Sequence, residues 1–186
     1  MEYSIKARIS GRHLHITKEL YEQLFDCELT KKNDLSQIGD FASNQTLTIR
    51  NGDKKIENVR ICGPFRKYTQ IEITKTDARK LGVNPPIRHS GDLNNSAKIT
   101  LETEKASIET DGLIIMARHV HMSPEDAKKY NVKDMQKVKI RIDGIRSAVV
   151  DAEVKINDNG VYEVHFDTDE GNAFNLEDNE EVTLKI

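Results

Sequence analysis

Cysteine and long apolar runs are scarce in this chain of 186 residues, and neither sign of charge is in strong excess. The two cysteines, Cys27 and Cys62, lack Cys-x-x-Cys spacing and imply no disulfide framework, which favours a reduced, cytosolic setting. The longest apolar run, residues 113–117, is far too short to span a membrane, and residues 1–10 lack the apolar core of a signal peptide. A net charge of −3 creates no overall field that favours nucleic acid.

What the chain does contain is a duplicated Arg-His-x-His cluster, which uses four of its six histidines. The copies occupy residues 12–15 and 118–121, and each is followed by a helix-start signal. Neutral imidazole is the commonest transition-metal ligand among side chains. Residues i and i+2 of an extended strand point to the same face, so both rings of one cluster can reach one ion. The duplication therefore predicts two related metal sites, built on His13, His15, His119 and His121.

Each histidine pair needs further ligands from elsewhere in the chain. His165 ends a strand that enters an acidic turn, and it is a plausible third ligand for one pair. Glu72 lies between apolar residues that would point to the opposite face of its strand, so its carboxylate could complete the other site. The alternative for Glu72 is an exposed strand residue. His89 lies in a Pro-rich loop, where a plain loop role is the better interpretation.

Period-2 alternation dominates the sequence and predicts many short strands. An Asn-Gly turn at residues 51–52 predicts a hairpin. Thr17 and Ser123 are predicted N-caps of two short helices, 18–25 and 125–130, and a third helix should end at Gly82. Strands are expected at residues 4–9, 45–50, 56–61, 70–74, 98–101, 107–108, 113–117, 137–142, 148–156, 160–166 and 181–186. Short strands with frequent turns favour a mainly β fold, and the repeat makes that two small β-barrels with short capping helices.

Several arginines lie near the histidine-bearing segments. Arg66 follows a Gly-Pro turn just before the Glu72 strand, which places it near the predicted metal face. A guanidinium beside a metal suits bidentate binding of phosphate or carboxylate. Other arginines could add to a site for a polyanionic ligand, although each could equally be a solvated surface charge: Arg12, Arg60, Arg88 and Arg118.

From about Ser4 to Glu181 the chain resembles the phosphate propanoyltransferase family, associated with bacterial propanediol-utilisation microcompartments. The resemblance rests on many motifs in the same order along the chain. They are the two Arg-His-x-His clusters, Leu35-Ser36-Gln37, Gly63-Pro64-Phe65-Arg66, Thr69-Gln70-Ile71-Glu72-Ile73, Pro86-Ile87-Arg88-His89-Ser90-Gly91-Asp92 and His165-Phe166-Asp167-Thr168-Asp169-Glu170-Gly171-Asn172-Ala173.

The resemblance implies transfer of an acyl group between coenzyme A and inorganic phosphate, with two zinc ions in a cleft between two β-barrels. It implies one barrel over residues 12–117 and a second over residues 118–186, completed by the strand at residues 1–11. One zinc, facing the coenzyme A sulfur, would be held by His13, His15 and Glu72. The other zinc would be held by His119, His121 and His165. Arg66 would bind phosphate, and the positions that match coenzyme A contacts are Ser10, Arg60, Cys62 and Asn172.

The resemblance has departures and further implications. Ile38 stands where the family has Pro, Asp40 where it has Gln, and Gly171 where Ala is common, which affects loop geometry more than the ligands. Microcompartment members carry an N-terminal amphipathic helix, whereas the segment before Arg12 is predicted as a strand, so we expect a free cytoplasmic enzyme. The family also suggests a small homodimer. Neither a membrane nor a nucleic acid is expected as a partner.

Two other classes of function remain open at the level of sequence. His-x-His on a β-barrel also serves metal-dependent hydrolases and cupin-like oxygenases, although those sites usually need one metal and no duplicated pair. A non-catalytic module that binds metal or coenzyme A would share the ligands but would form no acyl phosphate. The preferred acyl chain has no readable signature in the sequence.

Overall fold

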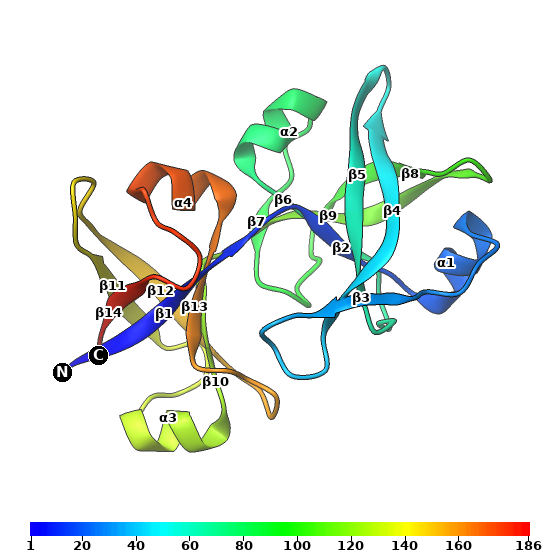
Figure 1. The fold of residues 1–186 in the computed structure, drawn as a ribbon. Coiled ribbons are helices and arrows are strands. Elements are labelled where there is room, and N and C mark those ends of the chain that lie inside the picture. The colour runs from blue at the N-terminus through cyan, green and yellow to red at the C-terminus, as the bar shows by residue number, and fades with distance from the viewer. The chain divides into compact units, whose positions relative to one another are not determined.

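The computed structural model describes all residues, 1–186, as a mainly β protein with four short helices (Figure 1). The helices are α1 (Lys18–Leu24), α2 (Lys75–Leu81), α3 (Pro124–Tyr130) and α4 (Thr168–Phe174). The strands are β1 (Glu2–Ser10), β2 (His13–His15), β3 (Lys31–Asp34), β4 (Phe41–Asn51), β5 (Lys54–Gly63), β6 (Gln70–Ile73), β7 (Ile87–Arg88), β8 (Ala97–Glu102), β9 (Ser107–Met116), β10 (His119–Met122), β11 (Lys137–Ile142), β12 (Ala148–Ile156), β13 (Glu163–Asp167) and β14 (Glu181–Lys185).

The chain divides into two compact units. One unit comprises Met1–Gly11 with Ala117–Ile186, and its strands close into a six-stranded barrel in the order β1-β13-β10-β12-β11-β14. In Figure 1 the dark blue strand β1 runs beside β13 and β14, the last strand of the chain. β1 pairs in parallel with β13 and antiparallel with β14, so the first strand of the chain is one of the six strands of this barrel.

The other unit, Arg12–Met116, also forms a closed ring of six strands. The order β4-β5-β2-β6-β9 is closed by β8, which pairs with both β4 and β9. The short strands β3 and β7 pair outside this ring, with β4 and β9 respectively. The two units together therefore confirm the predicted fold of two β-barrels.

The pairing pattern is the same in both barrels. β2 pairs in parallel with β5 and antiparallel with β6, just as β10 pairs with β12 and β13. β6 pairs in parallel with β9, as β13 does with β1. β1 thus corresponds to β9, and β14 corresponds to β8. β9 is the last strand of its barrel in the sequence, whereas β1 is the first strand of its own. The halves are a duplication related by circular permutation.

Strand alternation divides each barrel between an apolar interior and a polar outer face. Leu14 and Ile71 are fully buried in the core of one barrel, and Val120 and Val164 are fully buried in the core of the other. Because successive side chains point to opposite faces, filling the interior with these residues directs their neighbours outward. Both His-x-His motifs are such neighbours, and so are the residues that flank Ile71 and Val164.

The caps predicted at Thr17 and Ser123 and the helix end predicted at Gly82 are confirmed, and Thr74 is a further cap. Thr17, Thr74 and Ser123 each accept a hydrogen bond from a backbone amide in the first turn, and Gly82 ends α2 with a positive φ of 69°. Such side-chain caps satisfy amides that otherwise lack partners at helix starts. The predicted hairpin is also confirmed, since β4 and β5 pair from Asn51 opposite Lys54.

Some local expectations were incomplete. No range was predicted for helix α4, although the acidic residues at its start were candidates for a helix cap, and Asp167 and Glu170 do form a capping box there. The strands expected at 107–108 and 113–117 are one strand, β9, which passes through Gly112 at a φ of 107°. The strand expected from residue 160 begins at Glu163. Weak alternation around a glycine concealed the continuity of β9.

None of the four helices is long enough to span a membrane.

Candidate metal centres

The register of the strands brings a third side chain beside each histidine pair. In one barrel β2 lies antiparallel to β6, with His13 opposite Glu72. In the other barrel β10 lies antiparallel to β13, with His119 opposite His165. Directly opposed residues of antiparallel strands present their side chains on the same face, with Cβ atoms about 5 Å apart. The third residue of each cluster therefore occupies the same place in both barrels.

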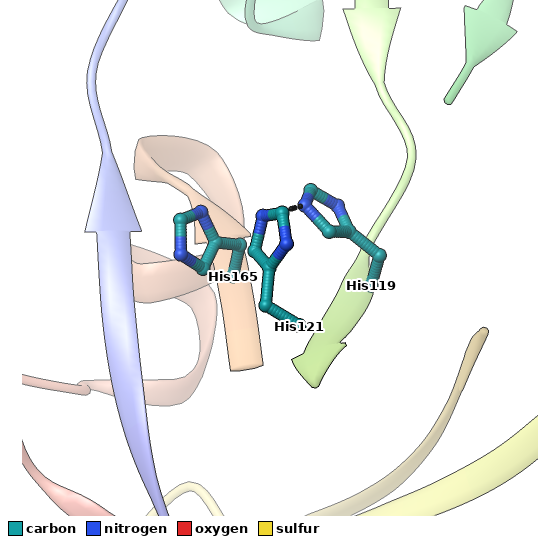
Figure 2. A group of neighbouring side chains, drawn as sticks. All are labelled: His119, His121 and His165. Carbon is teal, nitrogen blue, oxygen red and sulfur yellow. Dashed lines mark hydrogen bonds between the residues drawn. The ribbon is translucent and has the colours of Figure 1, made fainter. Parts of the chain in front are cut away.

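The cluster on β10 and β13 consists of three imidazoles that gather at one point (Figure 2). Nε2 of His119 lies 2.9 Å from Nε2 of His121. Nδ1 of His119 lies 2.8 Å from the carbonyl oxygen of Ala117, so Nδ1 carries the proton and donates it to that oxygen. This leaves the Nε2 lone pair of His119 directed at the other rings. The ring centroids of His119 and His121 are 5.2 and 4.7 Å from that of His165.

The cluster on β2 and β6 has a carboxylate in place of the third ring. Nε2 of His13 lies 3.8 Å from Oε2 of Glu72, and the rings of His13 and His15 meet edge to face at 5.3 Å between centroids. Glu72 is only 6% exposed, so it is not the exposed strand residue that was the alternative interpretation. A carboxylate buried to this degree requires compensating positive charge or hydrogen bonds.

Both clusters fit a bound zinc ion by their donor chemistry and spacing. In each, one ligand atom per residue lies within 4.8 Å of the others. Three histidines, or two histidines with one glutamate, are the sets of three protein ligands typical of zinc sites that keep one position open, with bonds of about 2.0–2.2 Å. Nε2 of His119 and Nε2 of His121 belong to buried side chains and are 2.9 Å apart, already close to the separation that a shared ion requires.

Arg66 lies in the same barrel as the His13 cluster and is held from two sides. Its Nη2 donates to Oδ2 of Asp40 at 3.1 Å, and its Nη1 donates to Oγ of Ser90 at 3.3 Å. Burial raises the pKa of the Asp40 carboxyl, and the opposing charges of Arg66 and His13 reduce that shift. A guanidinium has five N–H donors, so these two bonds leave capacity for an anion.

The other arginines have partners within their own units. Nε of Arg12 lies 2.8 Å from buried Asp77, and Arg118 pairs with Glu170 in the equivalent place. Asp77 and Glu170 are the third residues of α2 and α4, in their capping boxes. These two ion pairs therefore join each Arg-His-x-His strand to a helix start, and the structure favours this role over that of a polyanion site.

Arg60 and Arg88 bind backbone carbonyl groups. Nη1 of Arg60 donates to the carbonyls of Ser43 and Asn44 at 2.9 and 3.1 Å, and Nε of Arg88 donates to that of Asn94 at 3.0 Å. Arg60 is directly opposite His13 in the β2–β5 register, so it adjoins the first cluster.

The remaining predicted residues fall in several places. Oγ of Ser10 lies 3.5 Å from Nδ1 of His165, whereas Asn172 is an exposed residue of α4. Cys62 is buried on β5, where burial raises the pKa of its thiol to about 12, with smaller contributions from the charges of Glu72 and Asp40. His89 belongs to neither metal-type cluster, and its carbonyl accepts a turn hydrogen bond from Asp92.

Two residues at the clusters were missed by sequence reasoning. Gln70 and Glu163 occupy corresponding positions, opposite His15 and His121, and each contacts the third residue of its cluster. The signal that could have identified them is the same period of two that identified the cluster residues. Each stands two residues before the third residue of its cluster, on the same strand.

Comparison with known proteins gives one family. The family model for phosphate propanoyltransferase matches residues 6–177. A phosphate propanoyltransferase of Lachnoclostridium phytofermentans is 44% identical over 187 residues, which covers 98% of this chain and 87% of that protein. That of Priestia megaterium is 46% identical and covers 91% of this chain and 80% of its own length. That of Thermotoga maritima is 42% identical, with coverages of 92% and 84%.

Proposed function

Because this chain belongs to the phosphate propanoyltransferase family and is therefore an acyltransferase, we propose that it moves a short acyl group, acetyl or propanoyl, between coenzyme A and inorganic phosphate. In the forward direction a phosphate oxygen attacks the thioester carbonyl carbon. A C–O bond forms, the C–S bond breaks, and the sulfur leaves as the thiolate of coenzyme A. The observation that carries the proposal is a pair of partly buried three-residue clusters with zinc-type donor sets, one of them in the same barrel as Arg66.

The clusters are the proposed sites of two zinc ions. His13, His15 and Glu72 would hold the zinc that meets the coenzyme A sulfur, and His119, His121 and His165 would hold the other. Bound zinc supplies Lewis-acid polarisation of a carbonyl and stabilises a departing thiolate. The hydrogen bond from His119 Nδ1 to the Ala117 carbonyl keeps Nε2 available as the ligand atom.

Arg66 is the proposed phosphate-binding residue. Its guanidinium can donate two parallel hydrogen bonds to phosphate oxygens and hold the nucleophile in one orientation. Ser90 and Asp40 fix the side chain before phosphate arrives. Phosphate is then the only nucleophile the step requires, because the Cys62 thiol, with its pKa raised to about 12, stays protonated near neutral pH.

Ser10, Arg60, Cys62 and Asn172 are the proposed contacts of coenzyme A. Two of them adjoin the His13 cluster through β5, where Arg60 is opposite His13 and Cys62 follows two residues later on the same face. Ser10 adjoins the other cluster through its contact with His165. We expect Arg60→Ala to raise the KM for acyl-CoA and to leave the KM for phosphate unchanged.

The role of Arg66 is tested by steady-state kinetics of Arg66→Ala. We expect the KM for phosphate to rise about 10–100-fold, since hydrogen bonds to charged groups contribute about 1.5–3 kcal/mol each. Arg88→Ala is the matched control, because Arg88 is also partly buried but donates to a backbone carbonyl in its own loop. An unchanged KM for phosphate in Arg66→Ala would refute the assignment.

The reaction class and the metal are tested together. Arsenate should replace phosphate and cause continuous loss of acetyl-CoA, because acyl arsenates hydrolyse spontaneously. A hydrolase would consume acetyl-CoA without arsenate, and a non-catalytic module would not consume it at all. Metal analysis should give two zinc ions per chain, and removal of zinc by a chelator should abolish the reaction. A series of acyl-CoA chain lengths then identifies the preferred substrate.

A further inference from the structure

One position outside the ligand clusters is repeated in both barrels and holds the third ligand in each. Gln70 begins β6 two residues before Glu72, and Glu163 begins β13 two residues before His165. Because the strand period is two, both residues of each pair lie on the outer face, next to the histidines. Both positions are buried, with Gln70 at 0% and Glu163 at 4% exposure. A buried polar side chain at such a position needs partners.

Gln70 is hydrogen-bonded at both ends of its amide. Its Nε2 donates to Oε1 of Glu72 at 2.5 Å and to Oγ of Ser90 at 2.9 Å. Its Oε1 accepts from the backbone amide of Gly91 at 2.8 Å. Gln70 therefore occupies one carboxylate oxygen of Glu72, while the other, Oε2, faces His13. The same serine accepts a hydrogen bond from Arg66, so one short network joins the proposed phosphate site to the proposed zinc ligand.

Glu163 has the complementary role in the other barrel. Its Oε1 lies 2.8 Å from Nε2 of His165, and its Oε2 lies 3.7 Å from Nε of Arg8. A carboxylate can only accept, so Nε2 of His165 donates and Nδ1 is left as the nitrogen that can bind an ion. Ligating histidines commonly donate their second ring N–H to a carboxylate, which orients the ring and raises its basicity.

Gln70 and Glu163 occupy the same position in the two barrels but differ in chemistry. Each offers the hydrogen-bonding group that its neighbouring third ligand needs. Glu72 has only acceptor oxygens, and its neighbour Gln70 supplies a donor. His165 has a ring N–H to place, and its neighbour Glu163 supplies an acceptor. A residue that merely filled space would show no such match. Each barrel also has one carboxylate at its site, either as the third ligand or directly behind it.

We propose that Gln70 and Glu163 are positioning residues that hold Glu72 and His165 in the orientation needed to bind zinc. The proposal rests on the zinc sites of the proposed function. Gln70 restricts Glu72 to one coordinating oxygen, and Glu163 selects the ring nitrogen of His165. Loss of either hydrogen bond should weaken one zinc site only, since the two residues belong to different barrels.

The test is zinc affinity, measured by competition with a chromophoric chelator. Gln70→Met and Glu163→Met keep the side-chain length but remove the polar atoms. In each we expect one of the two zinc equivalents to bind about 10–100-fold more weakly, which is the usual effect of losing a partner of a ligand. The double variant should weaken both equivalents. With Co²⁺ in place of zinc, each single variant should alter the visible absorption of one equivalent.

Two further variants separate positioning from mere packing. Glu163→Gln retains an acceptor oxygen, so it should restore most of the affinity lost in Glu163→Met. Gln45→Met is the matched control, because Gln45 is also a hydrogen-bonded glutamine of the same barrel as Gln70, but its partners are in residues 27–30. We expect Gln45→Met to bind both zinc equivalents with the same affinity as the parent protein. If Gln70→Met does not fold, the comparison of Glu163→Met with Glu163→Gln still tests the proposal.

The outcomes are distinguishable. If the parent protein binds no zinc, the proposed function fails. If the parent binds two zinc ions and the methionine variants match its affinity and cobalt spectrum, the positioning role is overturned. It is also overturned if Glu163→Gln is as weak as Glu163→Met, because an accepting oxygen is then insufficient.

Discussion

Asp40 shares the guanidinium that we assign to phosphate. Its Oδ2 accepts from Nη2 of Arg66 at 3.1 Å, and burial raises the pKa of its carboxyl although Arg66 opposes that shift. An ionised carboxylate at this distance has two effects on an incoming phosphate. It orients Arg66, and it repels the anion that Arg66 must bind.

We therefore predict that Asp40→Asn lowers the KM for phosphate. The amide can still accept from Arg66, so the side chain keeps its orientation while one negative charge is removed. The change should be about fivefold, since unit charges 4 Å apart in water interact by about 1 kcal/mol. Initial rates measured at varied phosphate concentration give this KM, and Asp92→Asn in the nearby loop is the control. A higher KM in Asp40→Asn would mean that orientation dominates over repulsion.

Cys62 is close to the charged groups of the first cluster but is unsuited to covalent chemistry. Burial raises the pKa of its thiol to about 12, and only a thiolate is an effective nucleophile. Since the folded protein disfavours the charged form, proton loss from Cys62 requires strongly alkaline conditions.

We predict that Cys62→Ala keeps the parent kcat near neutral pH. Iodoacetamide should modify the exposed Cys27 and spare Cys62 in the native protein, as peptide mapping would show. Labelling of Cys62 should rise only as the pH approaches 12. A fall in kcat of more than about tenfold in Cys62→Ala would instead indicate covalent catalysis.

At the scale of elements, short polar segments at the ends of strands form the caps that start the next helix. Thr74 with Asp77, Ser123 with Asp126, and Asp167 with Glu170 form capping boxes. Two of these boxes follow directly after β6 and β13, the strands that bear the third residue of each cluster. The Ser123 box was predictable from Pro124 and the acidic first turn. The box at Asp167 was less distinct, because its acidic residues could either cap a helix or support metal-binding histidines.

Strand β9 illustrates a constraint that only packing reveals. Gly112 has a φ of 107°, and a Cβ there would overlap the carbonyl oxygen of Thr69. Gly39 has a similar φ of 90° but no atom within 4 Å of the same position. The two glycines therefore share the backbone requirement and differ in the space around them.

We predict that Gly112→Ala destabilises the protein more than Gly39→Ala does. Both substitutions incur about 1–2 kcal/mol for a non-glycine residue at positive φ. Gly112→Ala should lose about a further 1–3 kcal/mol, because the overlap forces β6 and β9 apart. Urea unfolding monitored by circular dichroism measures both. Equal losses would mean that the backbone conformation accounts for the whole effect.

At the scale of the whole molecule, the two barrels are one topology with different starting points. The antiparallel pair β8–β9 is joined by a short turn, whereas the corresponding pair β14–β1 consists of the two ends of the chain. The N-terminal ammonium group of Met1 donates to the backbone oxygen of Ile186 at 2.6 Å, and the backbone amide of Ile186 donates to the carbonyl oxygen of Met1 at 3.0 Å. β1 and β14 thus pair as the two strands of a hairpin do.

We predict that a circular permutant folds normally when a four-residue turn joins Ile186 to Met1 and the chain opens between Gly11 and Arg12. Its stability to urea should stay within about 1 kcal/mol of the parent, since a short turn adds little closure entropy. Amide exchange should show β1 and β14 still protected. The control permutant opens the two-residue turn between Asn51 and Lys54, and it should be less stable because β4 and β5 lose their local connection. Lost protection of β1 and β14 in the first permutant would contradict the correspondence.

The sequence by itself determined the β-rich fold, most of the strands, three of the four helices and the two histidine pairs. These features depend on local pattern: alternation of two, caps at fixed offsets, and identical residues repeated along the chain. Glu72 and His165 were also identified as candidates, Glu72 because it stands between apolar neighbours on an alternating strand and His165 because it ends a strand that enters an acidic turn.

Only the tertiary structure decided which side chains contact the residues of the two clusters and which arginines already have partners. Gln70, Glu163, Asp77 and Glu170 look in sequence like ordinary polar residues of strands and helix starts. The places of Gln70 and Glu163 follow from strand register, which brings together residues that are more than 40 positions apart, as β2 with β6 and β10 with β13. Asp77 and Glu170 meet Arg12 and Arg118 because each lies at the start of a helix that follows one of these strands. Register is a property of paired strands and of the packed cores beneath them, so no local pattern contains it.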